Sequence, residues 1–321
     1  MKEFGGYFEL EQFCGCEYHS TGVLRFNYCR FAWQYLLEAR KITKIYIPYY
    51  ICDSLIVPAM RSGVQIEYYH IDESFCPVCE HIPTDREAIL IVNYFGFLNQ
   101  QKLQSLVDKY KHIIVDNTQA FFARPIKDVD TLYSCRKFFG VPDGGYLFAQ
   151  GVPTPTLSQD SSADRMNFLT GRLEDGAQKH YLEFRRAEDN AEEEGVKSMS
   201  NTTQNLLRGI DYERVKAVRT QNYQRMHEQL RAYNVLNHMP ALEGPYIYPL
   251  YFKGDAQRLR TFLAENHVYV PVLWNNVYDV LREDCLETRL VSHILPLPID
   301  QRYTIADVDE ISAIVERGIK Q

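Results

Sequence analysis

The chain of 321 residues is long enough for about two domains of roughly 150 residues each and for a substantial core. Its formal net charge is −7 and it has no basic run, which argues against nucleic acid or an anionic membrane surface as a partner. The contents of 45% hydrophobic and 24% charged residues are typical of a globular protein.

The beginning of the chain shows no targeting pattern. Residues 1–6 lack the continuous apolar stretch of a signal peptide. No segment approaches the roughly 18 apolar residues that a membrane-spanning helix needs. We therefore expect a cytoplasmic protein without a membrane partner.

The cysteines form two close pairs, Cys14 with Cys16 and Cys76 with Cys79. These four residues could in principle ligate zinc. However, C-x-C is a poor spacing for such a site, and no strand–helix pattern supports a redox site. We therefore expect buried or incidental thiols and no metal site.

Helical and strand-like segments alternate through the first half of the chain. The pattern predicts helices over 31–39, 54–61 and 100–110, and strands over 44–48, 65–69, 88–93, 112–116 and 146–149. Such alternation indicates βαβ units, and hence a parallel sheet covered by helices. Sheets of this kind bind ligands beyond the carboxyl ends of their strands.

The second half changes character. Residues 154–195 are polar and charged, and we expect solvated helices and loops there. Beyond them the pattern predicts helices over 206–234, 255–266 and 305–319, and strands over 246–252 and 268–273. We divide the chain into an arm (1–20), a large domain (21–210) and a connector helix with a small α+β domain (211–321).

Lys137 lies in a constrained segment. Phe138 and Phe139 follow it, and then a Pro-Asp-Gly-Gly turn over 142–145. A lysine is usually a solvated surface charge, and Asp-Gly-Gly is usually just a turn. The phenylalanines would nevertheless desolvate the amine and favour its neutral, nucleophilic form, which Schiff-base chemistry requires.

Two further segments have both a plain and a functional interpretation. The apolar run 113–116 ends in Asp116, which could cap a helix or pair with a protonated pyridine nitrogen. Tyr28, Cys29 and Arg30 directly precede a predicted helix. They could form an ordinary helix start or a phosphate site on the free N–H groups.

The order of these segments resembles a known family. A helix-start anion site is followed by Asp116 with Gln119 three residues later, and then by Ser134 and Lys137 before the Asp-Gly-Gly turn. This order is similar to that of the DegT/DnrJ/EryC1/StrS sugar aminotransferases, which are fold-type I pyridoxal-phosphate enzymes. The similarity extends over most of the chain, but the motifs are specific only between 113 and 146.

The resemblance implies a role for each residue. The fold would be α/β and fold-type I PLP-transferase-like, with a mainly parallel sheet covered by helices and a small C-terminal α+β domain. Lys137 would be the Schiff-base lysine and proton shuttle, and Asp116 the partner of the pyridine nitrogen. Gln119 would contact the hydroxyl group of the cofactor ring. Ser134 and residues 28–30 would bind the phosphate of pyridoxal 5'-phosphate.

The resemblance also implies a reaction. The protein would move an amino group from an amino acid, typically glutamate, to a keto-sugar, typically a nucleotide-linked one, and would be a homodimer. Two alternatives stay open, namely elimination or dehydration with the same cofactor and a non-catalytic scaffold that keeps the fold. Lys137 favours transamination, since dehydratases of this family have histidine at that position.

Overall fold

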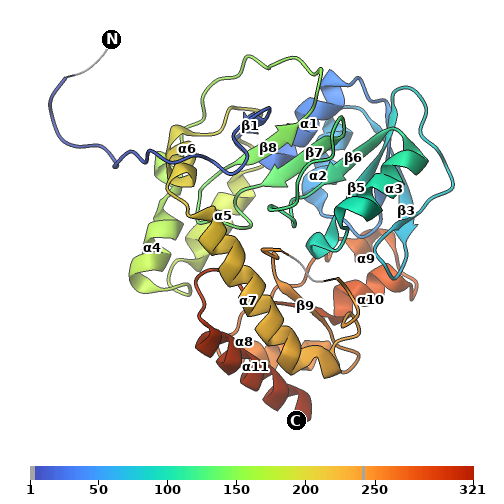
Figure 1. Cartoon of the computed structure of the whole chain (residues 1–321), viewed down its shortest axis with the longest axis vertical. Helices are drawn as coiled ribbons and strands as arrows, with labels where there is room; N and C mark the ends of the chain where they lie inside the picture. The colour runs from blue at the N-terminus through green and yellow to red at the C-terminus, as the bar shows by residue number, and fades with distance from the viewer. Residues whose placement is uncertain (1–3, 241–242) are drawn as a thin grey trace.

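The computed structural model describes residues 4–240 and 243–321, so residues 1–3 of the predicted arm lie outside the described residues (Figure 1). The predicted α/β class with a mainly parallel sheet is confirmed. The described residues form one eight-stranded sheet and one two-stranded sheet. None of the described helices combines the length and the hydropathy that a membrane crossing requires.

The large sheet has the strand order β1-β8-β7-β6-β5-β2-β3-β4. Its strands are β1 (Leu24–Phe26), β2 (Lys44–Pro48), β3 (Gln65–Ile71), β4 (Pro77–Val78), β5 (Glu87–Val92), β6 (Ile113–Asp116), β7 (Asp130–Ser134) and β8 (Gly145–Phe148). The five central strands, from β7 to β3, run parallel. The strands β1, β8 and β4 pair antiparallel at the two edges.

The central strands follow from their composition. Every residue of β6 is buried, as is every residue of β5 after Glu87, because helices cover both faces of the sheet. All five strands predicted in this half are confirmed. The strand β7 was missed, since its polar first residues, Asp130 and Thr131, hide the apolar pattern.

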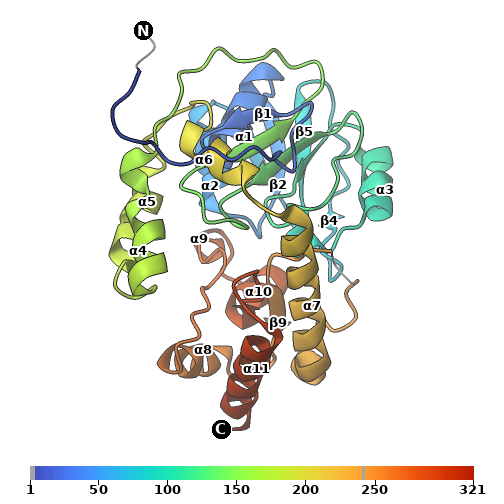
Figure 2. The same cartoon turned by 60° about the vertical axis from the view of Figure 1, so that its left-hand side comes forward.

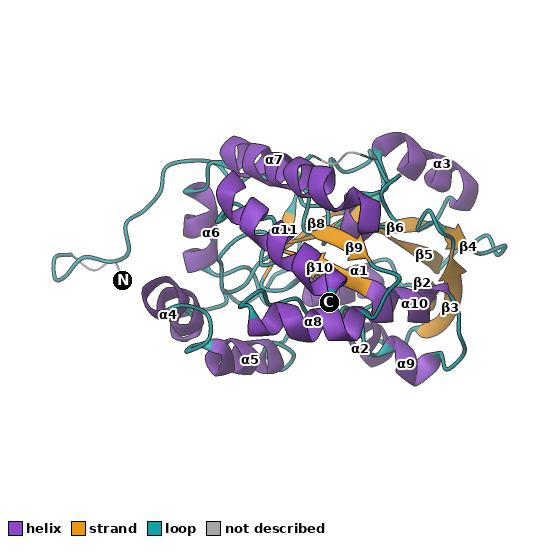
Figure 3. Cartoon of the chain, turned by 90° about the horizontal axis from the view of Figure 1, so that it is seen from below, coloured by secondary structure: helices purple, strands orange, loops and turns teal. Residues whose placement is uncertain are grey.

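Helices α1 (Cys29–Ala39), α2 (Asp53–Arg61) and α3 (Gln100–Tyr110) confirm the three predicted helices of this half. The apolar residues of α1 recur at helical spacing and are buried. The indole N–H of Trp33 donates to the carbonyl of Leu55 over 2.9 Å and joins α1 to α2. Figure 3 shows α3 on one side of the strands and α2 on the other.

The polar middle of the chain forms α4 (Asn167–Asp175) and α5 (Tyr181–Asn190), after a short 3₁₀ turn, η2 (Ala163–Arg165). Neither helix has a buried residue, as the prediction of solvated helices requires. The two helices lie side by side at the edge of the molecule (Figure 2). We call this pair the α4–α5 hairpin.

The predicted connector helix over 206–234 is interrupted. Helix α6 (Asn201–Arg208) ends before Gly209, and α7 (Tyr212–Leu230) begins anew. Asp211 caps α7 by accepting a hydrogen bond from the backbone N–H of Arg214. A cap residue in the middle of the predicted helix explains the break.

The C-terminal part contains η3 (Arg231–Tyr233), β9 (Tyr248–Tyr251), α8 (Ala256–Glu265), α9 (Val277–Val280), α10 (Leu286–His293), β10 (Ile294–Leu297) and α11 (Ile305–Lys320). The predicted strand over 268–273 is wrong, because that segment is a loop. β9 pairs antiparallel with β10 instead. Val268 and Val270 are buried and Tyr269 is exposed, so alternating burial alone does not make this segment a strand.

Candidate active site

A cavity of about 390 Å³ lies where three neighbouring strands of the large sheet end. Val92, Asp116 and Ser134 are the last residues of β5, β6 and β7, and all three line it. The carboxyl ends of parallel strands are the usual ligand sites of such sheets. The cavity therefore lies where the sequence predicted a site.

Lys137 and Asp116 both line this cavity, and Thr118 joins them. The Nζ of Lys137 donates to Thr118 Oγ1 over 3.0 Å. The backbone N–H of Thr118 donates to Asp116 Oδ1 over 2.8 Å. Asp116 is only 4% exposed, so the turn after β6 fixes its carboxylate in place. The structure thus brings the predicted lysine and carboxylate together and adds Thr118.

Gln119 packs behind the cavity. Its side-chain oxygen accepts a hydrogen bond from the backbone N–H of Phe95 over 3.0 Å. The side-chain amide of neighbouring Asn117 accepts from Asn93 and donates to Tyr133, so buried amides fix the whole turn. The contact between Gln119 and a cofactor ring stays a prediction.

The start of α1 forms an end of the cavity that favours an anion. Tyr28, Cys29, Arg30, Ser134 and Arg136 all line it. The first N–H groups of a helix have no partner within the helix, and the side chain of Tyr28 makes no capping bond. The Nε of Arg136 is buried and has no hydrogen-bond partner among the described residues. Burial lowers the pKa of Arg136.

Gly145 allows β8 to approach the start of α1 closely. A Cβ at this position would lie 2.5 Å from the backbone nitrogen of Cys29 and 2.7 Å from the carbonyl carbon of Tyr28. Gly144 has a φ of 120°, which side chains rarely adopt, and lines the cavity. The turn therefore requires glycine at 145 for steric reasons and at 144 for its backbone conformation.

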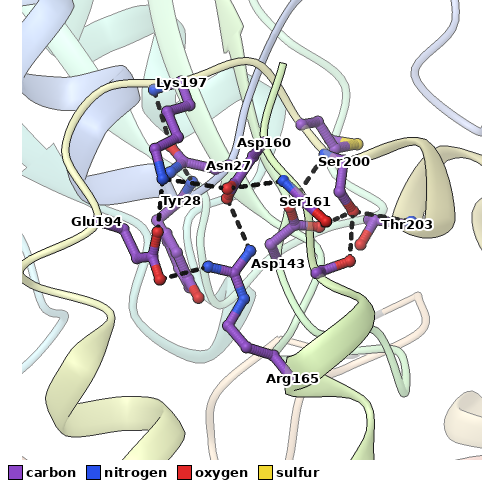
Figure 4. A network of polar contacts seen from close by, with 12 residues as sticks. Asn27, Tyr28, Asp143, Asp160, Ser161, Arg165, Glu194, Lys197, Ser200 and Thr203 are labelled. Carbon is purple, nitrogen blue, oxygen red and sulfur yellow. Dashed lines mark hydrogen bonds and ion pairs between the residues drawn. The ribbon is translucent and has the colours of Figure 1, made fainter. Parts of the chain in front are cut away.

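A network of ion pairs lies beside Tyr28, which lines this end of the cavity (Figure 4). Arg165 bonds Asp160 over 2.8 Å and Glu194 over 2.6 Å, and Lys197 bonds the same two carboxylates. Burial alone would lower the pKa of Arg165, but its bonds to Asp160 and Glu194 raise it. The charge of Arg165 is thus neutralised within the network, and its guanidinium packs 5.9 Å from the ring centre of Tyr28.

Asp143 ties the turn after Lys137 to the start of α6. It is fully buried and accepts two hydrogen bonds of 3.0 Å from Ser200, one from the backbone and one from the hydroxyl group. Burial raises the pKa of Asp143, although its hydrogen bonds from Ser200 oppose the shift. Ser200 also caps α6 by accepting from the N–H of Thr203. The Pro-Asp-Gly-Gly turn is therefore fixed on both sides.

A second wall of the cavity comes from distant parts of the chain. Phe168, Phe184 and Glu188 extend from the α4–α5 hairpin, and Tyr246 and Trp274 from the C-terminal part. The carboxylate of Glu188 pairs with Arg136, which lines the same cavity. No sequence pattern marked this wall, because its residues lie 31 to 137 positions beyond Lys137.

The C-terminal half also holds the backbone beside Lys137. The buried Arg219 of α7 donates to the carbonyl of Phe138 over 3.0 Å, and Gln301 donates to the same oxygen over 2.9 Å. Arg219 also donates to the carbonyls of Pro245 and Tyr246. Burial lowers the pKa of Arg219 to about 10.

The cysteines do not form the zinc site considered as an alternative. All eight are free thiols, with Cys14 and Cys16 exposed and Cys76 buried. Within 4–240 and 243–321, no three His, Cys, Asp or Glu side chains gather as a metal site would require. Cys29 lines the cavity, and burial there raises its pKa.

Comparisons with known proteins agree on the fold. No family model and no curated protein matches the sequence. Among solved structures, a DegT DnrJ EryC1 StrS aminotransferase from Brucella abortus has a TM-score of 0.63 and 15% identity, over 92% of this chain and 85% of that one. The ntda protein of Bacillus subtilis, with bound cofactor PMP, has a TM-score of 0.66 and 16% identity, over 93% of this chain and 73% of that one.

A sugar aminotransferase from Micromonospora echinospora has a TM-score of 0.63 and 13% identity, over 92% of this chain and 87% of its own. This chain has the fold of the DegT/DnrJ/EryC1/StrS aminotransferases. The expected fold-type I PLP-transferase-like architecture is thereby confirmed. At identities of 11–16%, the comparisons establish the aminotransferase fold and leave the role of each residue to the geometry of the site.

Sequence reasoning missed three residues that line this cavity. Arg136 directly precedes Lys137, so a cation beside the key lysine was a usable signal. Trp274 is one of only two tryptophans, which was a weaker signal. Nothing in the local sequence marked Thr118, whose hydroxyl group contacts Lys137 only in the folded chain.

Proposed function

We propose that this protein is a pyridoxal-phosphate-dependent aminotransferase that transfers an amino group to a keto-sugar. The observation that carries the proposal is the joint placement of Lys137, Thr118 and Asp116 in one cavity, facing the start of α1. The fold shared with sugar aminotransferases supports it. Glutamate as amino donor, a nucleotide-linked acceptor and a homodimeric assembly complete the proposal.

The residues of the cavity fit the cofactor. Its phosphate would lie at the start of α1, within reach of Ser134 and of Arg136, whose buried Nε lacks a partner among the described residues. Its pyridine nitrogen would pair with the buried Asp116. Its carbonyl carbon would bond Lys137. When bound, the cofactor supplies an electron sink for the carbanion at the substrate α-carbon.

The protein's own side chains would act on protons and positions. Asp116 would keep the pyridine nitrogen protonated, and Lys137 would carry a proton to and from the substrate carbon. Thr118 holds the amine of Lys137 at 3.0 Å in the free protein, so the lysine is oriented before a ligand binds. Phe139 lines the cavity beside it and excludes water. Gln119 would contact the ring hydroxyl, while its side-chain oxygen accepts from the N–H of Phe95.

The decisive experiment records the visible spectrum of the purified protein with pyridoxal phosphate, before and after borohydride. The wild type should show a visible band, and borohydride should attach the cofactor covalently to Lys137, as peptide mass spectrometry can verify. Lys137→Ala should lose the band and at least about 10³-fold in transamination rate. Lys127→Ala replaces an exposed lysine and serves as the control. A wild type that forms no adduct, or an alanine variant that keeps its rate, would contradict the proposal.

A further inference from the structure

Trp274 lines the cavity and has an unfavourable backbone conformation. It belongs to the loop that follows α8 and lines the cavity together with Lys137. Its φ is 56°, in the left-handed region that bulky residues rarely adopt. A residue in such a conformation must be held by its surroundings, and residues of this kind concentrate at functional sites.

The surroundings that hold Trp274 are two buried tyrosines. Its indole meets the ring of Tyr50 at 4.3 Å between centroids and 84° between planes, and that of Tyr94 at 5.5 Å and 76°. Tyr50 is fully buried, and its hydroxyl group has no partner among the described residues. The side chain of Asn276 also donates to the carbonyl of Ile51 over 2.9 Å. The loop is therefore fastened to the segment that follows β2.

Part of the indole remains accessible beside these contacts. Both tyrosines meet it nearly at right angles, and no ring among the described residues stacks parallel to it. Trp274 is partly exposed and lines the cavity, so a ligand there can reach it. The cavity thus offers an aromatic surface on the side formed by the C-terminal part.

The chemistry of the two expected substrates differs at such a surface. A pyranose ring presents a face of C–H groups that packs on an aromatic plane, while its hydroxyl groups project from the edge. An amino donor such as glutamate is a short chain with two carboxylates and needs cations, which the indole lacks. An indole in this position therefore favours the sugar and contributes nothing specific to the donor.

We propose that Trp274 is the stacking platform for the sugar ring of the acceptor and so determines acceptor specificity. This inference rests on the proposed function, because it presumes a sugar substrate in this cavity. It assigns the acceptor to the wall that the C-terminal part contributes. The donor and the acceptor would then be recognised by different walls of one cavity.

The first test is fluorescence. The chain has two tryptophans, and Trp33 is fully buried, so the difference between wild type and Trp274→Phe isolates the signal of Trp274. UDP-glucose and dTDP-glucose should quench this signal in the holoenzyme, whereas UDP and dTDP without the sugar should not. Equal quenching by nucleotide and sugar nucleotide, or no quenching at all, would overturn the proposal.

The second test separates the two half-reactions. Trp274→Gly removes the indole at a position whose φ suits glycine, so the backbone need not change. We expect sugar-nucleotide affinity and the acceptor half-reaction to fall about tenfold, and about threefold in Trp274→Phe. The spectral change that glutamate alone causes should move less than twofold. A glycine variant that slows the glutamate step as much as the acceptor step would refute the assignment.

A control comes from the same loop. Tyr269 is 54% exposed and does not line the cavity, so Tyr269→Gly should leave both half-reactions unchanged. The failures of the two proposals are distinguishable. Absence of the visible cofactor band would refute the proposed function. A normal band and a normal glutamate step, without quenching by either sugar nucleotide, would refute the assignment of Trp274 alone.

Discussion

The cavity has two walls that are built differently. One wall, formed by the ends of β5–β7 and the start of α1, consists of buried strands, a fixed turn and a glycine in close contact with a helix. The other includes the α4–α5 hairpin, in which no residue is buried. The wall that would hold the cofactor is thus part of the core, and the α4–α5 hairpin is not. Substrate contacts can therefore change with little effect on folding.

The largest expected effect concerns the buried wall. In Gly145→Ala the new Cβ would collide with backbone atoms of Tyr28 and Cys29, which cannot move as a flexible side chain could. We expect a loss of about 3 kcal/mol in the free energy of unfolding, measured by urea denaturation, and weaker binding of pyridoxal phosphate.

The control for this substitution is Gly140→Ala. A Cβ at Gly140 would meet only Leu169, at an ordinary distance of 3.9 Å. Its stability should stay within about 0.5 kcal/mol of the wild type. If both variants were equally stable, the close approach of β8 to α1 would have no energetic importance.

The next largest effect depends on pH. His19 supports the same wall from beneath β7, with its ring 4.2 Å from that of Tyr133 and its Nε2 2.9 Å from the carbonyl oxygen of Phe121. Burial lowers its pKa from 6.5 to about 4. The unfolded chain therefore takes up a proton at this site between pH 6.5 and 4, while the folded chain does not.

Folding stability should consequently fall as the pH drops through this window. Above pH 6.5 this proton uptake has no effect on the free energy of unfolding. Near pH 4 it lowers the free energy of unfolding by about 3 kcal/mol. His19→Gln keeps a donor and does not titrate, so urea denaturation at pH 7 and pH 4.5 should show a smaller loss for this variant. His238→Gln, at an exposed position, should behave like the wild type.

A smaller effect is expected at Thr118. Thr118→Val removes the hydroxyl group that accepts the hydrogen bond from Lys137 and leaves the backbone bond to Asp116 intact. We expect kcat to fall about tenfold, the value of roughly one hydrogen bond to a charged group, with little change in stability. Thr118→Ser retains the hydroxyl group and should recover most of the rate. Equal rates in the two variants would show that Thr118 does not orient the lysine.

The smallest effect should come from the hairpin. Glu188→Gln breaks the ion pair with Arg136, but the side chain of Glu188 is 31% exposed and no residue of its helix is buried. We expect a change below about 0.5 kcal/mol in stability. A loss above 2 kcal/mol in thermal or urea unfolding would mean that the hairpin is as integral as the strand wall, and the contrast between the walls would fail.

The two walls also differ in how far the sequence predicted them. The strand end at Asp116 follows from a local pattern, since apolar runs define buried strands and the ends of parallel strands meet. Ser134 and Lys137 were recognised from the order of the motifs, because the strand β7 was not predicted. Glu188 and Trp274 reach the cavity through long-range packing, which leaves no local periodicity. The false strand over 268–273 has the same origin, because only the tertiary fold decides which segment pairs with β9.

The contacts of Arg219 have a consequence for the cooperativity of the molecule. The buried guanidinium of Arg219 donates a hydrogen bond to the carbonyl of Phe138, which follows the key lysine. It also donates to the carbonyls of Pro245 and Tyr246, more than 100 residues later in the chain. Separating these segments would leave the charged guanidinium and the three carbonyl oxygens without these hydrogen bonds. A fragment that stopped before α7 would lack this tie, so the lysine segment depends on sequence that follows it. The two parts of the chain should therefore melt in a single transition.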